Sequence, residues 1–121
     1  MPKKKIVIIE DEVNIANAQK MILGDDFNVS VAYDGDEGMK RIREKKPDLI
    51  VLDLMLPNRG GYDICFNLRQ DPELQDIKIL MVTALNQDLD KDKGVMVGTD
   101  GYLTKPFEPE QLLTAVRNLL S

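Results

Sequence analysis

Short apolar runs alternate along the chain with longer stretches that have the periodicity of a helix. The runs at 6–9 and 48–53 are almost continuously apolar, which is typical of parallel strands buried on both faces. Weaker strand patterns occupy 28–33, 77–82 and 101–103. Helical spacing of apolar residues follows each strand, at 13–23, 36–46, 62–70, 86–97 and from 109 to the end of the chain.

The order of these elements is strand then helix, five times over. Such alternation predicts an α/β fold, with an open, doubly wound five-stranded parallel sheet and helices on both faces. A closed eight-stranded α/β barrel would need about twice as many residues. The 121 residues are therefore interpreted as one domain, spanning 1–121.

Composition narrows the function classes. Lys and Arg number 16 and Asp and Glu 21, which gives a net charge of −5, so the chain is not expected to bind nucleic acid or an anionic membrane. The sequence has no His, which excludes histidine-assisted nucleophiles and imidazole metal sites, and its single Cys excludes an internal disulfide. No apolar run approaches the roughly 20 residues of a membrane-spanning helix, and the cytoplasm is the expected location.

Polar and charged side chains stand where the predicted strands end. Glu10 and Asp11 follow the first strand, Asp53 ends the third, Thr83 follows the fourth and Lys105 follows the fifth. Alone, Glu10 and Asp11 are explained as helix caps or solvated groups, and Thr83 and Lys105 as structural residues. Asp53 is harder to explain in this way, because an ionised carboxylate within an apolar run must be paired or metal-bound. Because the carboxyl ends of parallel strands share one edge of the sheet, we expect the five side chains to converge there.

Three carboxylates brought together repel one another, and a divalent cation would relieve that repulsion. Mg²⁺ prefers oxygen ligands and leaves positions open for water and phosphate, and Mn²⁺ is expected to substitute for it. Lys105 adds a positive charge and Thr83 a hydroxyl donor. The set predicts a site for a phosphoryl group, with a carboxylate as nucleophile.

Four motifs in order along the chain resemble the receiver domain of two-component response regulators, which has the chemotaxis-regulator fold. They are 8–12 (Ile-Ile-Glu-Asp-Glu), 53–57 (Asp-Leu-Met-Leu-Pro) with Gly61 eight residues after Asp53, 82–84 (Val-Thr-Ala) and 101–107 (Gly-Tyr-Leu-Thr-Lys-Pro-Phe). The resemblance implies the strand order 2-1-3-4-5. It also implies a function: phosphorylation of Asp53 by a sensor histidine kinase or a phosphotransfer protein, in a switch that is not a turnover enzyme.

The same resemblance implies roles for the site residues. Asp53 is the expected phosphoacceptor, and the metal ligands are expected to be Asp11, Asp53, the backbone carbonyl of Met55 and, through water, Glu10. Lys105 is expected to pair with Asp53 and then with the phosphoryl oxygens, and Thr83 is expected to hydrogen-bond the phosphoryl group. The remaining positions are Ala84, whose small side chain leaves the phosphoryl group accessible, Tyr102, the aromatic that turns inward with Thr83, and Pro106, preceded by a cis peptide.

Output is expected at the surface formed by 86–97, the fifth strand and the last helix. Lys91, Lys93, Asp100 and Arg117 lie in or beside these elements and are candidates for ion pairs across a homodimer, with ordinary solvated charge as the equal alternative. Two departures from the family pattern affect the predictions of metal binding and of the output surface. The first acidic position, often Asp, is Glu10, and the run at 94–99 replaces the Gly-Ala that often leads into the fifth strand.

Other functions share parts of this pattern. A phosphatase of the haloacid-dehalogenase type also uses a strand-end Asp with Mg²⁺, but its second Asp would stand at Met55. A flavodoxin-like nucleotide binder needs a Ser-, Thr- or Gly-rich loop where this chain has acidic residues. A receiver that acts as a scaffold without phosphorylation remains an alternative, and so does a receiver joined to a winged-helix DNA-binding domain.

Overall fold

The computed structural model describes residues 2–57, 60–84 and 98–121. Its parallel strands form one sheet in the order β2-β1-β3-β4-β5, which confirms the expected topology. The strands are β1 (Lys5–Ile9), β2 (Asn28–Ala32), β3 (Leu49–Asp53), β4 (Lys78–Ala84) and β5 (Gly101–Lys105).

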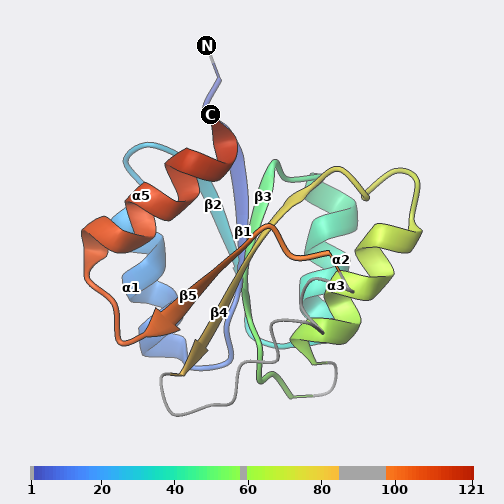
Figure 1. The fold of residues 1–121 in the computed structure, drawn as a ribbon, viewed down its shortest axis with the longest axis horizontal. Coiled ribbons are helices and arrows are strands. Elements are labelled where there is room, and N and C mark those ends of the chain that lie inside the picture. Colours follow the sequence, from blue (N-terminus) through green and yellow to red (C-terminus); the bar gives the residue numbers. More distant parts are fainter. Residues whose placement is uncertain (1, 58–59, 85–97) are drawn as a thin grey trace.

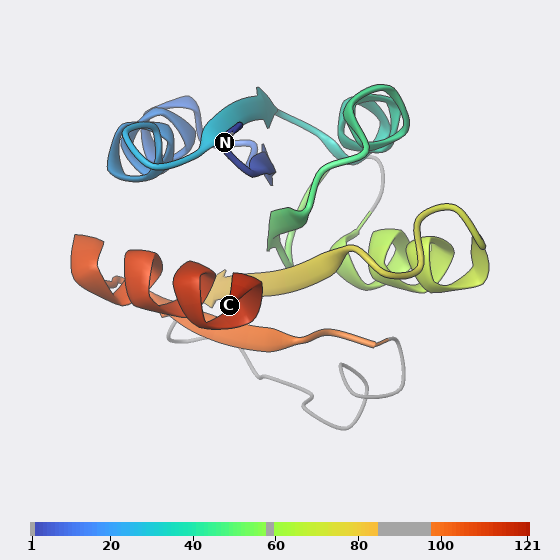
Figure 2. The ribbon, with the colours of Figure 1, turned by 90° about the horizontal axis from the view of Figure 1, so that it is seen from above.

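The helices lie in two layers, one on each face of the sheet. α1 (Val13–Leu23) and α5 (Pro109–Leu120) cover one face, and α2 (Gly35–Lys45) and α3 (Gly61–Gln70) cover the other (Figures 1 and 2). The helix predicted over 86–97 lies outside the described residues. Of the helices in the described ranges, none is long and apolar enough to cross a membrane.

Alternation along the central strands divides the apolar side chains between two cores. In β1, Val7 and Ile9 pack into the core beneath α2 and α3, whereas Ile6 and Ile8 pack into the core beneath α1 and α5. Every residue of β3 is buried. The continuous apolar runs of the sequence therefore reflect strands covered on both faces, since each side of the strand needs apolar residues.

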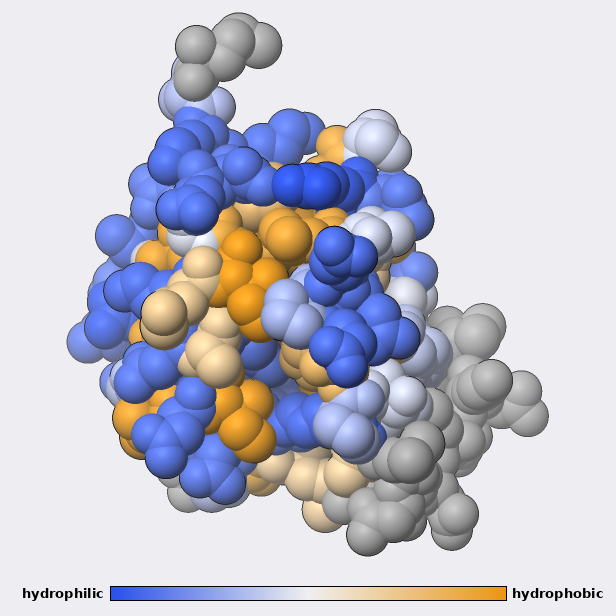
Figure 3. All heavy atoms as spheres, turned by 90° about the vertical axis from the view of Figure 1, so that its left-hand side faces the viewer, coloured by the Kyte–Doolittle hydropathy of each residue, from blue (hydrophilic) through white to orange (hydrophobic). Residues whose placement is uncertain are grey.

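The outer surface of the α1 and α5 layer is mostly polar, with smaller apolar patches between the charged side chains (Figure 3). A groove of about 440 Å³ separates α1 from the segment that follows β5, with Ile15, Ile22 and Phe107 in its walls. Lys105 and Pro106 also line it, so the groove adjoins the end of β5. Buried Gln19 also lines it, and its side-chain oxygen has no hydrogen-bond partner within the part of the chain that the structure describes.

Two strands extend beyond their predicted ends. β4 continues to Ala84 and β5 to Lys105, where apolar content had predicted ends at 82 and 103. The register pairs Thr83 with Thr104 and Ala84 with Lys105, so ladder pairing continues into the polar residues. Backbone hydrogen bonding does not depend on side-chain polarity, and apolar content alone underestimates a strand that ends in a site.

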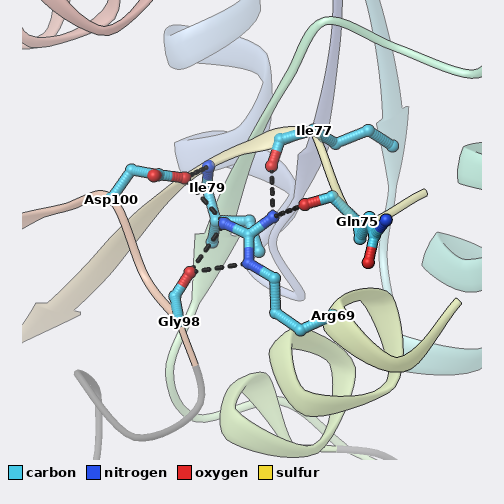
Figure 4. Close-up of polar contacts among 6 residues, drawn as sticks. All are labelled: Arg69, Gln75, Ile77, Ile79, Gly98 and Asp100. Atoms are coloured by element: carbon cyan, nitrogen blue, oxygen red, sulfur yellow. Dashed lines mark hydrogen bonds and ion pairs between the residues drawn. The ribbon is translucent and has the colours of Figure 1, made fainter. Parts of the chain in front are cut away.

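An arginine near the end of α3 holds the start of β5. All five N–H groups of the Arg69 guanidinium donate hydrogen bonds (Figure 4). Nη1 donates to the carbonyls of Gln75 and Ile77, both at 2.7 Å, and Nε and Nη2 donate to the carbonyl of Gly98 at 2.8 and 2.6 Å. Nη2 also pairs with Asp100 Oδ2 at 2.7 Å. We call this set of contacts the Arg69 clamp.

Two further features belong to the clamp. Asp100 Oδ2 also accepts from the backbone N–H of Ile79 at 2.7 Å, which ties the segment before β5 to β4. Gly98 has φ of +89°, and a Cβ there would come within 2.8 Å of Arg69 Nε. Glycine is thus required at 98 both for its backbone conformation and for the space that the arginine occupies.

Gly38 has no room for a side chain, because α2 approaches β1 closely. A Cβ there would lie 2.5 Å from Cδ1 and 2.9 Å from Cγ1 of Ile9, which is fully buried. We expect Gly38→Ala to lower the free energy of unfolding by about 2 kcal/mol in urea titrations, because overpacking outweighs the helix propensity of alanine. Gly60→Ala is the matched control, with nothing within 4 Å of its added Cβ, and an equal loss there would contradict the explanation.

Candidate functional site

The carboxyl ends of four strands meet at one edge of the sheet and bring the predicted side chains together. Glu10 follows β1 and Asp53 ends β3, while Thr83 is the second-to-last residue of β4 and Lys105 ends β5. Lys105 contacts both Glu10 and Asp53, which are 95 and 52 residues away in the sequence. The sheet order explains the contacts, because β1, β3, β4 and β5 are consecutive neighbours.

Three carboxylates form the acidic part of this site. One oxygen each from Glu10, Asp11 and Asp53 lies within 4.8 Å of the others. Glu10 and Asp53 are buried, at 2% and 8% exposure, whereas Asp11 is exposed. An all-oxygen donor set that is open to solvent on one side suits Mg²⁺, which binds through one or two carboxylates and keeps several waters.

Asp53 is held on both of its carboxylate oxygens. The backbone N–H of Met55 donates to Oδ1 at 3.1 Å, and Lys105 Nζ lies 3.3 Å from Oδ2. The turn that makes the first contact depends on Gly61, where a Cβ would come within 2.7 Å of the Asp53 carbonyl oxygen. The nucleophilic candidate is therefore fixed in orientation while it stays at the rim of the pocket.

Glu10 and Lys105 form an ion pair in the pocket wall. Burial raises the pKa of the Glu10 carboxyl above its ordinary value, with the hydrogen bond from Lys105 acting in the opposite direction. Burial alone would lower the pKa of Lys105, but the hydrogen bond to Glu10 and the negative charge of Asp53 outweigh it, so that pKa is raised. Lys105 is therefore a permanent positive charge at neutral pH.

The remaining predicted residues lie in β4, in β5 and directly after β5. Thr83 is 1% exposed, and its hydroxyl has no hydrogen-bond partner among the described residues. Tyr102 packs against the core beneath α2 and α3. Its buried hydroxyl also has no hydrogen-bond partner within the described ranges. Ala84 is half-buried at the end of β4. The peptide bond between Lys105 and Pro106 is cis, as expected.

Two of the four charged residues suggested for a dimer surface have partners within the chain. Asp100 belongs to the Arg69 clamp, and Arg117 pairs with Asp26 at 2.6 Å. Lys91 and Lys93 lie outside the described residues, as does most of the unusual run at 94–99. A cross-dimer role for the four positions stays a prediction.

Sequence reasoning missed the backbone groups that support the site. The N–H of Glu12 donates to Glu10 Oε2 at 3.1 Å, and the N–H of Met55 supports Asp53, although only its carbonyl was expected to contribute. Backbone donors leave no trace in residue identity. The nearest signal was the glycine at 61, which marks a close approach of chain segments.

Comparison with known proteins agrees with this geometry. Residues 6–117 match the family described as the response regulator receiver domain. The chain is 44% identical over 117 residues to the DNA-binding dual master transcriptional regulator RpaA of Synechocystis, covering 96% of this chain and 48% of RpaA. It is 40% identical over 118 residues to the alkaline phosphatase synthesis transcriptional regulatory protein PhoP of Bacillus subtilis, covering 97% and 48%. The chain thus spans about half the length of the curated relatives it matches.

Solved structures agree as well. A response regulator from Chloroflexus aurantiacus superimposes with a TM-score of 0.91 at 34% identity, covering 98% of both chains. The chemotaxis response regulator CheY4 of Vibrio cholerae gives a TM-score of 0.91 at 28% identity, covering 98% of this chain and 99% of that one. The match over residues 6–117 shows that the chain belongs to the response regulator receiver domain family of two-component signalling.

Proposed function

We propose that Asp53 is the phosphoacceptor of this receiver domain. The observation that carries the proposal is the placement of the Asp53 carboxylate at the pocket rim, at the end of β3. A backbone N–H holds one of its oxygens, and the other lies beside Lys105. Receiver domains are phosphoacceptor switches and generally not enzymes. The proposed reactions are therefore phosphorylation from a donor and later hydrolysis of the aspartyl phosphate.

In the transfer step, a carboxylate oxygen of Asp53 attacks the phosphorus of a phosphohistidine on a sensor kinase or phosphotransfer protein. The P–N bond breaks, the imidazole leaves with its electron pair, and an acyl phosphate forms on Asp53. Lys105, already 3.3 Å from Oδ2, offsets the added negative charge. The hydroxyl of Thr83, which has no hydrogen-bond partner among the described residues, is available as a donor to a phosphoryl oxygen.

Mg²⁺, with Mn²⁺ as a substitute, fits the donor set of this pocket. Asp11 and Asp53 would hold it directly, with the Met55 carbonyl as a further ligand and Glu10 acting through water. A bound ion supplies positive charge that stabilises the transferred phosphoryl group. The closeness of the three carboxylates supports this assignment, because without a counter-charge they repel one another.

We propose that Thr83 and Tyr102 couple phosphorylation to the output surface. Thr83 would move toward the phosphoryl oxygens, and Tyr102 would turn into the space it leaves, so that two conformations are populated in different proportions. The buried hydroxyl of Tyr102 has no hydrogen-bond partner among the described residues. This supports the proposal, because the side chain would gain a partner by moving. The surface around β5 and α5 would then change its partners, including a second copy of the chain.

Relatives named as DNA-binding regulators support a longer protein in which this switch controls DNA binding. The chain itself, at a net charge of −5, is not proposed to contact DNA. The cytoplasm is the proposed location, where the kinase would present its phosphohistidine.

Labelling with a small phosphodonor tests the proposal. We expect incubation with acetyl phosphate and Mg²⁺ to add one phosphoryl group to the intact mass, and borohydride trapping to locate it at Asp53. Removing the metal with EDTA should lower the labelling rate by more than about tenfold, because the charge of the phosphoryl group is then less well balanced, and Mn²⁺ should restore it. Equal labelling with and without metal would contradict the metal assignment, and absence of labelling in Mg²⁺ would favour the scaffolding alternative.

A further inference from the structure

Glu10 is the most deeply buried of the three site carboxylates, and both of its oxygens are engaged. It is 2% exposed and its backbone N–H donates to the Ala32 carbonyl at 3.0 Å, which fixes it at the end of β1. Oε1 accepts from Lys105 Nζ, and Oε2 accepts from the N–H of Glu12. Each oxygen of Glu10 therefore already holds a donor, and one of these donors is the ammonium group of Lys105.

Asp11 and Asp53 are placed differently. Asp11 is exposed, and Asp53 lies at the rim with its side chain 11% exposed. A buried carboxylate such as that of Glu10 needs a counter-charge, because an unpaired charge is costly to remove from water. Within the described ranges, Lys105 is the cation in ion-pair contact with Glu10 and with Asp53.

We propose that Glu10 is a positioning residue for Lys105, and that its carboxylate holds the ammonium group against the pocket wall while Asp11 and Asp53 face the metal. This inference rests on the proposed function of Asp53. Without Glu10, the ammonium would pair with Asp53 alone and occupy the side of that carboxylate where a metal and a phosphoryl group must approach. The extra methylene of glutamate at this position, where the family often has aspartate, thereby gains a role: it gives the carboxylate its reach to Lys105.

NMR of the lysine ammonium groups tests the contact without any phosphorylation. Ammonium protons give a ¹H–¹⁵N signal when an ion pair slows their exchange with water, and Lys105→Arg identifies the signal by its loss. We expect the Lys105 signal in the wild-type chain and in Glu12→Gln, which removes one neighbouring charge but keeps the backbone donor. It should broaden beyond detection in Glu10→Gln and in Glu10→Asp, the second variant keeping the charge but not the reach. An unchanged signal in both Glu10 variants would overturn the proposal.

Kinetics separate positioning from metal binding. With acetyl phosphate at saturating Mg²⁺, we expect Glu10→Gln and Glu10→Asp to be labelled about tenfold or more slowly than the wild type, because Lys105 is misplaced. Glu12→Gln should match the wild-type rate. Its Mg²⁺ dissociation constant, measured by calorimetry, shows how much the loss of one nearby negative charge weakens metal binding by itself. Wild-type labelling of Glu10→Asp once Mg²⁺ saturates would overturn the proposal and make Glu10 a metal ligand. If the wild-type chain is not labelled at all, the proposed function fails, while the ammonium spectra still decide the role of Glu10.

Discussion

Asp53→Asn will lose phosphoryl labelling by acetyl phosphate in Mg²⁺, with a rate at least about a hundredfold below that of the wild type. The amide has nearly the shape of the carboxylate and can still accept the N–H of Met55, so the fold should persist. The amide carries no negative charge and is a poor nucleophile, so it does not attack the phosphorus atom of acetyl phosphate. Intact-mass spectrometry over a time course measures the loss.

Asp76→Asn provides the control for this substitution. Asp76 is exposed and precedes β4, at the edge of the sheet away from the pocket. It should be labelled at the wild-type rate, and circular dichroism should show both variants folded. Undiminished labelling of Asp53→Asn would refute Asp53 as the acceptor.

The second large effect concerns stability. We expect Arg69→Met to lower the free energy of unfolding by about 3 kcal/mol, because Asp100 is left without its counter-charge and three carbonyls lose their donors. The side chains of Arg69 and Asp100 are only 20% and 27% exposed, so water replaces the lost contacts poorly. Methionine keeps much of the aliphatic stem, which limits the effect to the guanidinium. For a domain of this size the melting temperature should fall by roughly 10 °C.

Arg117→Met is the matched control, since it removes an arginine from an exposed pair. Arg117 and Asp26 are 59% and 48% exposed, and exposed pairs contribute about 0 to 1 kcal/mol. Urea titrations of both variants give the comparison. Equal losses of stability in the two would show that the Arg69 clamp contributes no more than a surface ion pair. Arg69→Lys should fall between wild type and Arg69→Met, since one ammonium cannot reach four acceptors.

Much of the fold followed from the pattern of apolar residues. The strands at 6–9 and 48–53 were clear because burial on both faces leaves no polar residue in the interior of either run. The order of strands could not be derived from periodicity, which records how each strand is covered but not which strand is beside it. That order came from the resemblance to receiver domains, and the structure confirms it.

The side chains of the site were predictable, but only some of the contacts between them were. Glu10, Asp53 and Lys105 were visible because polar residues at strand ends in a parallel sheet must share an edge. The resemblance implied the contact of Lys105 with Asp53, which the structure shows. The contact of Lys105 with Glu10 depends on side-chain reach and burial, which the sequence does not encode locally. The Arg69 clamp was invisible for the same reason, since most of its acceptors are backbone carbonyls in separate segments.

The position of β5 at the edge of the sheet has a consequence for signalling fidelity. Among the strands of the described residues, β5 pairs with β4 alone, and it carries Lys105. Asp53 lies on a central strand between β1 and β4. A chain in which β5 has detached from the sheet would keep Asp53, the proposed acceptor, but would lose the positive charge of Lys105 that we propose to stabilise the phosphoryl group. Misfolded or partly degraded copies would therefore be phosphorylated poorly, and signalling would be restricted to the intact domain.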